Sequence, residues 1–187
     1  MMAYKVDSDF FLAIPRPDKD AARLFQLIDM DRVSFRKFLP WVDAIKSYKN
    51  EEDFLAKVNI NFGKGISLNL VIWYQQEIVG MISFNHLNKL DDSADIGYWL
   101  GKNYRRRGLM TKAVKGICNI GFSEYALNRI VIRAAIDNVD SNAVAKKEGF
   151  THEGILRKGE KLLDGYHDEN IYSLLQDEWR RMNARET

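Results

Sequence analysis

The hydrophobic pattern of this chain changes its period near residue 66, and that change limits the folds it can adopt more than any other feature. Before this point the apolar residues recur at helical spacing, over residues 18–30 and again over 51–62. After it, runs rich in β-branched and aromatic residues predict successive strands at 68–74, 78–84 and 93–100. The short turn 75–77 joins the first two strands in an antiparallel hairpin. Helices therefore precede a β-meander.

The second half of the chain alternates between helices and strands. Its predicted elements are a helix at 109–125, a strand at 129–136, a short helix at 141–148 that ends at Gly149, and strands at 155–162 and 170–175. This order predicts an α+β or α/β fold with a mixed sheet. No repeat and no linker composition interrupts the chain, so we expect one domain over residues 1–187.

The charge and cysteine content argue against several classes of protein. The 187 residues carry 28 basic and 26 acidic side chains, whereas dedicated nucleic-acid binders carry a marked basic excess. The single cysteine, Cys118, has no partner for an internal disulfide, which indicates a reducing compartment. The first residues lack the apolar run of a signal peptide, and no apolar run approaches the ~20 residues that cross a bilayer. We therefore expect a cytoplasmic protein that binds neither nucleic acid nor membrane.

The stretch from Asp95 to Thr111 is the most informative motif. A predicted strand runs into a loop of three arginines and a glycine, 105–108, which opens directly into a helix. The first turn of a helix has unpaired N–H groups and a dipole that attract an anion, and a glycine lets the backbone approach that anion closely. A solvated basic turn is the simpler interpretation of the arginines alone, but the strand–loop–helix placement favours a pyrophosphate site. The loop matches neither a Walker A motif nor a Rossmann fingerprint.

A second polar turn follows the next predicted strand. Asn138 and Ser141 lie where that strand gives way to a helix, and helix capping alone explains either residue taken by itself. Two neighbouring strands that both end in a polar turn and a helix form a cleft where they part. A ligand in this cleft contacts both turns.

These motifs resemble, in the same order, the GNAT superfamily of N-acetyltransferases, and in particular its RimJ/RimL branch. The superfamily's acetyl-CoA loop reads Gln/Arg-x-x-Gly-x-Gly/Ala. Here it appears at 105–110, with Met110 in place of the last small residue and Arg106 where glycine is common. The resemblance covers most of the chain, and its other matching segments are 39–41, 96–100, 138–142, 147–150, 153–157 and 164–168.

The resemblance implies a GNAT fold with acetyl-CoA, the co-substrate, in a V-shaped gap where two parallel strands part. The pyrophosphate would lie on the backbone amides of the basic loop. Backbone groups of Trp99 and Leu100 would pair with the pantetheine arm, and one such amide would polarise the thioester carbonyl. The residues assigned to the coenzyme are Trp99, Leu100, Arg105, Arg106, Arg107, Gly108, Leu109, Met110, Thr111 and Asn138.

The resemblance also implies direct attack of a primary amine on the thioester, with no covalent enzyme intermediate. Glu160 matches the branch's base, acting through water, and Ser141 matches its acid beside the leaving sulfur. A lone glutamate in a polar turn is otherwise usually a surface residue. Trp41, Phe38 and Tyr98 are assigned to the acceptor, although the region around Trp41 is also explained as core or as a dimer contact. The family implies a homodimer.

The chemistry of amines favours one acceptor over others. An α-amine has a pKa of about 7.7–8 and a lysine side chain about 10.4, so a site with one carboxylate base suits a protein N-terminus. The branch points to the N-terminus of a ribosomal protein. The alternatives are a small amine (polyamine, amino sugar or antibiotic) and a sensor that binds acetyl-CoA and transfers nothing. The three histidines lack metal-ligand spacing, so no metal site is expected, and Cys118 is expected to be buried inside a helix.

Overall fold

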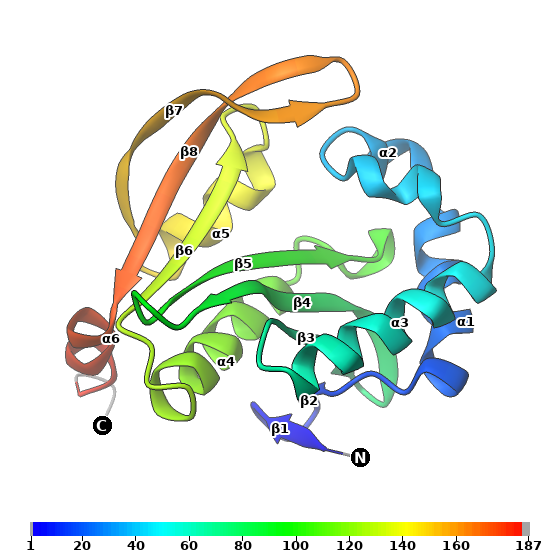
Figure 1. Cartoon of the computed structure of the whole chain (residues 1–187), viewed down its shortest axis with the longest axis horizontal. Helices are drawn as coiled ribbons and strands as arrows, with labels where there is room; N and C mark the ends of the chain where they lie inside the picture. The colour runs from blue at the N-terminus through cyan, green and yellow to red at the C-terminus, as the bar shows by residue number, and fades with distance from the viewer. Residues whose placement is uncertain (1, 185–187) are drawn as a thin grey trace.

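The computed structural model describes residues 2–184 and contains one eight-stranded mixed sheet (Figure 1). The strands are β1 Ala3–Lys5, β2 Phe10–Ala13, β3 Leu68–Tyr74, β4 Glu77–Asn88, β5 Ser93–Leu100, β6 Arg129–Ala135, β7 Thr151–Leu162 and β8 Gly165–Leu175. Their spatial order is β1-β2-β3-β4-β5-β6-β8-β7. Every neighbouring pair is antiparallel except β5 and β6, which run parallel. The predicted mixed sheet, mostly antiparallel with one parallel pair, is confirmed.

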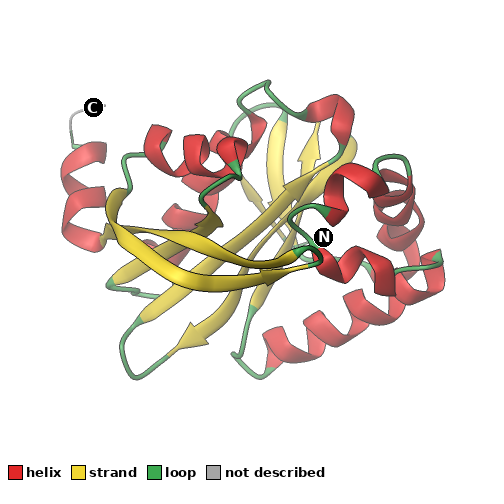
Figure 2. Cartoon of the chain, turned by 90° about the horizontal axis from the view of Figure 1, so that it is seen from above, coloured by secondary structure: helices red, strands yellow, loops and turns green. Residues whose placement is uncertain are grey.

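Helices cover both faces of this sheet (Figure 2). They are α1 Pro17–Asp29, α2 Arg32–Arg36, α3 Tyr48–Gly63, α4 Leu109–Ser123, α5 Val139–Lys147 and α6 Gln176–Asn183, with the short 3-10 helices η1 Pro40–Ala44 and η2 Lys102–Tyr104. Successive residues of a strand point to opposite faces. In β3, Leu70 and Ile72 therefore pack in the layer that contains α4, whereas Val71 packs in the layer that contains α1 and α3.

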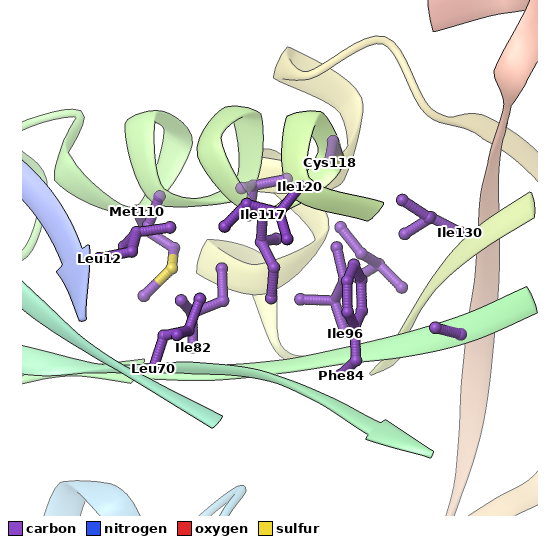
Figure 3. Packing of buried hydrophobic residues seen from close by; sticks show 14 of the residues in the cluster. Leu12, Leu70, Ile82, Phe84, Ile96, Met110, Ile117, Cys118, Ile120 and Ile130 are labelled. Atoms are coloured by element: carbon purple, nitrogen blue, oxygen red, sulfur yellow. The ribbon is translucent and has the colours of Figure 1, made fainter. Parts of the chain in front are cut away.

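The larger apolar layer lies between α4 and the centre of the sheet (Figure 3). Ile117 is fully buried on the inner face of α4, as are Ile82 and Phe84 on β4. Fully burying a side chain of this size contributes roughly 1.5–3 kcal/mol. This packing fixes the position of α4, which begins at Leu109 after the loop 101–108 that leaves the carboxyl end of β5.

The ends of the chain differ from the sequence prediction. The first third was predicted to be helical, yet it contains β1 and β2 before α1. β2 is a run of four residues that pairs with β3, where the rings of Phe11 and Trp73 stack at 5.5 Å. Such a short apolar run has no readable period, and its partner strand lies far away in the sequence. β7 and β8 also begin earlier than predicted, because the first residues of both strands, 151–154 and 165–169, carry no hydrophobic alternation.

The predicted end of the helix at Gly149 can be checked against the backbone. Gly149 has φ +74° beyond the end of α5, so its predicted left-handed conformation is confirmed. Within residues 2–184 no helix is both long and apolar enough to cross a membrane.

Candidate functional site

The parallel strands β5 and β6 part at their carboxyl ends. Their pairing runs from Ser93 opposite Arg129 to Ile96 opposite Ile132 and stops there. The rest of β5 stays paired with β4, and the rest of β6 stays paired with β8. The two strands therefore diverge, as Figure 1 shows, and the inner backbone edge of residues 97–100 is left without a neighbouring strand. An extended chain of peptide-like groups pairs with such an edge as an added strand does.

The basic loop ends in a helix start that is ready to bind an anion. The first hydrogen bond within α4 runs from the amide of Lys112 to the carbonyl of Gly108, at 3.1 Å, so the amides of residues 109–111 precede it. Gly108 has φ +75°, and a Cβ built on it would meet nothing within 4 Å. The space beside its backbone is therefore open. Unpaired amides, a helix dipole and close backbone access fit a pyrophosphate.

Arg106 also adopts a left-handed backbone conformation, with φ +59°. The sequence places this arginine where the family commonly has glycine, and the loop keeps the glycine-like angle. For a residue with a side chain this conformation costs roughly 1–2 kcal/mol. The loop therefore has two left-handed positions, Arg106 and Gly108, only one of which is a glycine.

The side chains of the three arginines separate. Arg106 is exposed, with Nη2 4.0 Å from Asp140 Oδ1 at the start of α5. Arg107 lies over the ring of Tyr74, 5.4 Å from its centroid. Arg105 points away from both, toward α2. The structure thus leaves the side chains of Arg106 and Arg107 exposed on the loop but not that of Arg105.

The second polar turn brings Asn138, Ser141 and Tyr98 together. The Asn138 side chain caps α5 by accepting a hydrogen bond from the Ser141 amide at 3.2 Å. The Ser141 hydroxyl lies 2.9 Å from the hydroxyl of Tyr98, so this contact joins β5 to the first turn of α5, the helix that follows β6. Burial raises the pKa of Tyr98 to about 12, and the phenol therefore stays protonated at neutral pH. Tyr98 packs in the layer that contains α4, on the same side of the sheet as Ser141.

Asn142 is a positioning residue that sequence reasoning missed. Its side-chain amide donates to the carbonyls of Ala135 at 2.9 Å and Asn138 at 2.8 Å. Its oxygen accepts from Tyr172 at 2.9 Å and from the Asn170 amide at 2.6 Å. These four hydrogen bonds hold the turn after β6 against β8. The available signal in the sequence was a further short polar side chain in the same turn as Asn138 and Ser141.

Glu160 lies on β7 opposite His167 of β8, near the carboxyl end of β6. Burial raises the pKa of its carboxyl above the ordinary value, and the neighbouring Glu169 raises it further, against weaker opposing effects that include a hydrogen bond with the backbone of Ala135. Glu169 is itself held by Arg133, whose Nε and Nη2 donate to Oε2 at 2.9 and 2.5 Å. Glu160 is half-buried and does not fit the alternative of an ordinary surface residue.

The predicted acceptor residues lie on different faces of the sheet. Trp41 is 41% exposed, and its ring lies 6.4 Å from that of Trp99, which in turn meets Phe35 edge-on at 5.5 Å. This aromatic cluster belongs to the layer with α1 and α3. The Phe38 ring is covered by the Lys37 ammonium at 4.9 Å. Tyr98 points to the opposite face because it neighbours Trp99 on the same strand.

The remaining titratable candidates have ordinary structural surroundings. Cys118 is buried in α4, and burial raises the pKa of its thiol well above the usual range. His152 Nε2 contacts Asn170 Oδ1 at 3.0 Å, and His167 lies between Asp164, at 2.9 Å, and Asp137, at 3.5 Å. Within residues 2–184 no group of three or more His, Cys, Asp or Glu side chains is placed to hold a metal ion.

Residues 11–151 match the family model described as the acetyltransferase (GNAT) domain. The chain belongs to the GNAT acetyltransferase family. It is 33% identical over 157 residues to the ribosomal-protein-serine acetyltransferase of Escherichia coli K12, a match that covers 82% of this chain and 86% of that protein. The resemblance to the RimJ/RimL branch is therefore confirmed, and the enzyme transfers acetyl groups from acetyl-CoA.

Solved structures support the same assignment. RimL, the ribosomal L7/L12 α-N-protein acetyltransferase in complex with coenzyme A, matches with a TM-score of 0.90 at 26% identity, over 95% of this chain and 99% of that one. The microcin C7 self-immunity acetyltransferase MccE, in complex with acetyl-CoA and AMP, matches with a TM-score of 0.86 at 33% identity, over 91% of this chain and 94% of that one. The GNAT fold and acetyl-CoA as co-substrate are thereby confirmed.

Proposed function

We propose that this N-acetyltransferase acetylates the α-amine of a protein N-terminus, that of a ribosomal protein in the first instance. The observation that carries the proposal is Glu160, a half-buried carboxylate near the end of β6 with a raised pKa. A single carboxylate suits an acceptor whose pKa is about 7.7–8, because a useful fraction of that amine is already neutral near pH 7. The activities named for the Escherichia coli relative and for RimL support the same class of acceptor.

The basic loop and β5 hold the co-substrate in this proposal. The amides of residues 109–111, with the open backbone at Gly108, receive the pyrophosphate, and Arg106 and Arg107 add positive charge. The free inner edge of residues 97–100 pairs with the pantetheine arm. The Gly101 amide donates to the Val79 carbonyl on β4, so the alternation of the strand turns the amide of Leu100 toward this edge and the backbone of Trp99 toward β4. Asn138 borders the arm from the opposite side. This places the thioester where β5 and β6 part.

Two side chains handle the protons of the transfer. Glu160, acting through water, accepts the proton that the amine loses as it attacks the carbonyl. Ser141 donates a hydrogen bond to the leaving sulfur. A thiol has a pKa of about 8.5, so the released thiolate of coenzyme A is protonated at neutral pH. Tyr98 holds the Ser141 hydroxyl at 2.9 Å and therefore belongs with the leaving group rather than with the acceptor.

The acceptor approaches from the face that carries α1, α2 and α3. Trp41 and Phe38 form its apolar wall in this proposal, while Glu160 lies at its inner end. We further propose that residues 1–187 form a single acetyltransferase domain, that the enzyme works in the cytoplasm, and that it forms a homodimer as the family resemblance implies.

A small-molecule amine is the second candidate acceptor. The exposed ring of Trp41, packed against Trp99, offers a flat apolar surface of the kind that stacks on a planar ring. The similarity to MccE, which was solved with AMP beside acetyl-CoA, makes amines linked to a nucleotide the small molecules to test first.

The experiment is thiol release from acetyl-CoA with a panel of acceptors. The panel contains N-terminal ribosomal-protein peptides, the same peptides with a blocked N-terminus, polyamines, amino sugars and nucleotide-linked amines. We expect release only with free peptide N-termini and a loss of kcat of about 100- to 10,000-fold in Glu160→Gln. The exposed Glu124→Gln at the end of α4 serves as the matched control and keeps the wild-type rate.

Each other result of the panel points to a different function. Release only with small amines replaces the acceptor class and keeps the co-substrate site. Silence across the panel with coenzyme binding intact favours the sensor.

A further inference from the structure

Arg105 belongs to the coenzyme loop by sequence, but its side chain is occupied elsewhere. Its Nε donates to the carbonyl of Leu100 at 3.0 Å, and its Nη1 donates to the Ser34 hydroxyl at 3.0 Å. Nη1 also lies 2.8 Å from Asp31 Oδ2, a charge contact whose angle does not make a hydrogen bond. The plane of the guanidinium covers the ring of Phe35, with Cζ 4.7 Å from the centroid. These four contacts direct the cation to α2 and away from the amides of the loop.

The groups that Arg105 holds lie behind the acceptor wall of Trp41 and Phe38. Asp31 precedes the first residue of α2 and its side chain is only 10% exposed, so its charge needs the guanidinium close by. Phe35 lies on α2 and meets Trp99 edge-on at 5.5 Å, and Trp99 lies 6.4 Å from Trp41. α2 has only five residues and has little stability of its own. Arg105 therefore anchors α2 to the end of β5, while Arg32 of α2 anchors it on the other side to the carbonyls of Val42 and Ile45.

The neighbouring arginines show the contrast. Arg106 has a side chain that is 86% exposed, and Arg107 is exposed on the face of Tyr74. Both keep their charge beside the loop, where an incoming phosphate would meet it. In Arg105 only the backbone remains part of the loop, and its side chain is 29% exposed.

We propose that Arg105 is a positioning residue for the acceptor and not a cation for the coenzyme phosphates. Its guanidinium clamps α2 onto the end of β5, and through Phe35 and Trp99 it sets the place of Trp41. The inference rests on the proposed function, in which this aromatic face receives the acceptor. It explains why an arginine in the coenzyme motif makes its contacts on the other side of the sheet.

The test distinguishes an effect on acceptor binding from an effect on coenzyme binding. Steady-state kinetics with both substrates varied, together with calorimetric binding of coenzyme A alone, are measured for the wild type, Arg105→Gln and Arg105→Lys. We expect the acceptor KM to rise about tenfold or more in both variants, because small displacements of a binding wall lower productive binding. The Kd for coenzyme A stays within about twofold of the wild type. Lysine keeps a positive charge but cannot reproduce the fork and the ring contact, so it does not rescue the acceptor KM.

A matched control and a second readout keep the result interpretable. Arg36→Gln removes an exposed ion pair with Asp43 in the same region, 2.6 Å long, and leaves both KM values near the wild type. Near-ultraviolet circular dichroism of the tryptophans changes in Arg105→Gln and not in Arg36→Gln, because the environment of Trp99 and Trp41 is altered. This signal is measured without an acceptor.

Two results would overturn the inference. A loss of coenzyme A affinity of about tenfold in Arg105→Gln, restored in Arg105→Lys, with an unchanged acceptor KM, would make the residue a phosphate-binding cation. An unchanged tryptophan signal in a folded Arg105→Gln would show that the clamp does not hold the aromatic cluster. If the wild type acetylates only small amines, the proposed acceptor fails. The kinetic measurements then use those small amines as acceptors. The calorimetric and circular-dichroism measurements need no acceptor and are unchanged.

Discussion

Replacing Glu51 by glutamine is expected to remove a pH-dependent weakness in the fold. Glu51 lies in the first turn of α3 with 2% of its surface exposed, and burial raises the pKa of its carboxyl from an ordinary 4.5 to about 7. The folded protein therefore binds this proton more tightly than the unfolded chain does. Unfolding releases a proton between pH 4.5 and 7, and stability falls as the pH rises through that window.

The size of the effect follows from the shift. About 2.5 pKa units, taken from 4.5 to about 7, correspond to about 3 kcal/mol at 1.36 kcal/mol per unit. This penalty is absent below pH 4.5 and complete above pH 7. Glu51→Gln, which cannot ionise, is expected to be about 3 kcal/mol less sensitive to pH than the wild type.

The assay is urea unfolding of both proteins at pH 5 and pH 8.5. The difference in unfolding free energy between Glu51→Gln and the wild type should grow by about 2.5 kcal/mol from pH 5 to pH 8.5, because the carboxyl of the unfolded chain is already partly ionised at pH 5. Glu52→Gln is the control. The side chain of Glu52 pairs with Lys49 at 3.0 Å and is more accessible to solvent than that of Glu51. We expect that variant to stay within about 0.5 kcal/mol of the wild type at both pH values. The same pH dependence in Glu51→Gln and in the wild type would refute the reasoning.

Three further predictions concern the site and its support. Gly108→Val puts a β-branched residue at φ +75° beside the open phosphate space and should weaken coenzyme A binding about tenfold or more by calorimetry. Tyr98→Phe removes the partner of Ser141, and kcat should fall about tenfold with an unchanged KM for acetyl-CoA; an unchanged kcat would contradict it. Glu153 is bound by Arg129 and Ser173, which lower its pKa to about 2, so its contribution to stability is full above pH 4.5 and lost as the pH falls toward 2. Because its side chain is 39% exposed, solvent screening limits the loss in Glu153→Gln to about 1 kcal/mol, measured by urea unfolding at pH 7 and shrinking by pH 3.

The interior of the fold could be predicted from the sequence because its elements carry strong periods. The strands 68–74 and 93–100 have the predicted bounds, and α4 begins at the predicted Leu109. β1 and β2 could not be predicted, because they are three and four residues long and exist only through pairing, β1 with β2 and β2 with the distant β3. The first four residues of β7, 151–154, form a segment that was missed for a related reason. Its residues face solvent at the edge of the sheet, so no hydrophobic alternation marks them.

The site shows the same division between pattern and geometry. The sequence contains the strand–loop–helix that brings unpaired amides to the carboxyl end of β5, and it contains the capping turn with Asn138. The sequence does not show where a side chain points. Arg105 looks like its neighbours Arg106 and Arg107 in the sequence, yet it alone reaches α2. Tyr98 looks like an acceptor residue next to Trp99, yet the alternation of the strand turns it to Ser141.

Mass-spectrometric mapping of the acetylated product distinguishes an α-amine acceptor from every other amine. A ribosomal-protein N-terminal peptide that also contains an internal lysine is incubated with acetyl-CoA and the wild-type enzyme, and the acetyl group is located by fragmentation. The account predicts acetylation of the α-amine alone, lost in Glu160→Gln and kept in Glu124→Gln. Acetyl groups on the lysine side chain, or an unmodified peptide beside turnover of small amines, would contradict it.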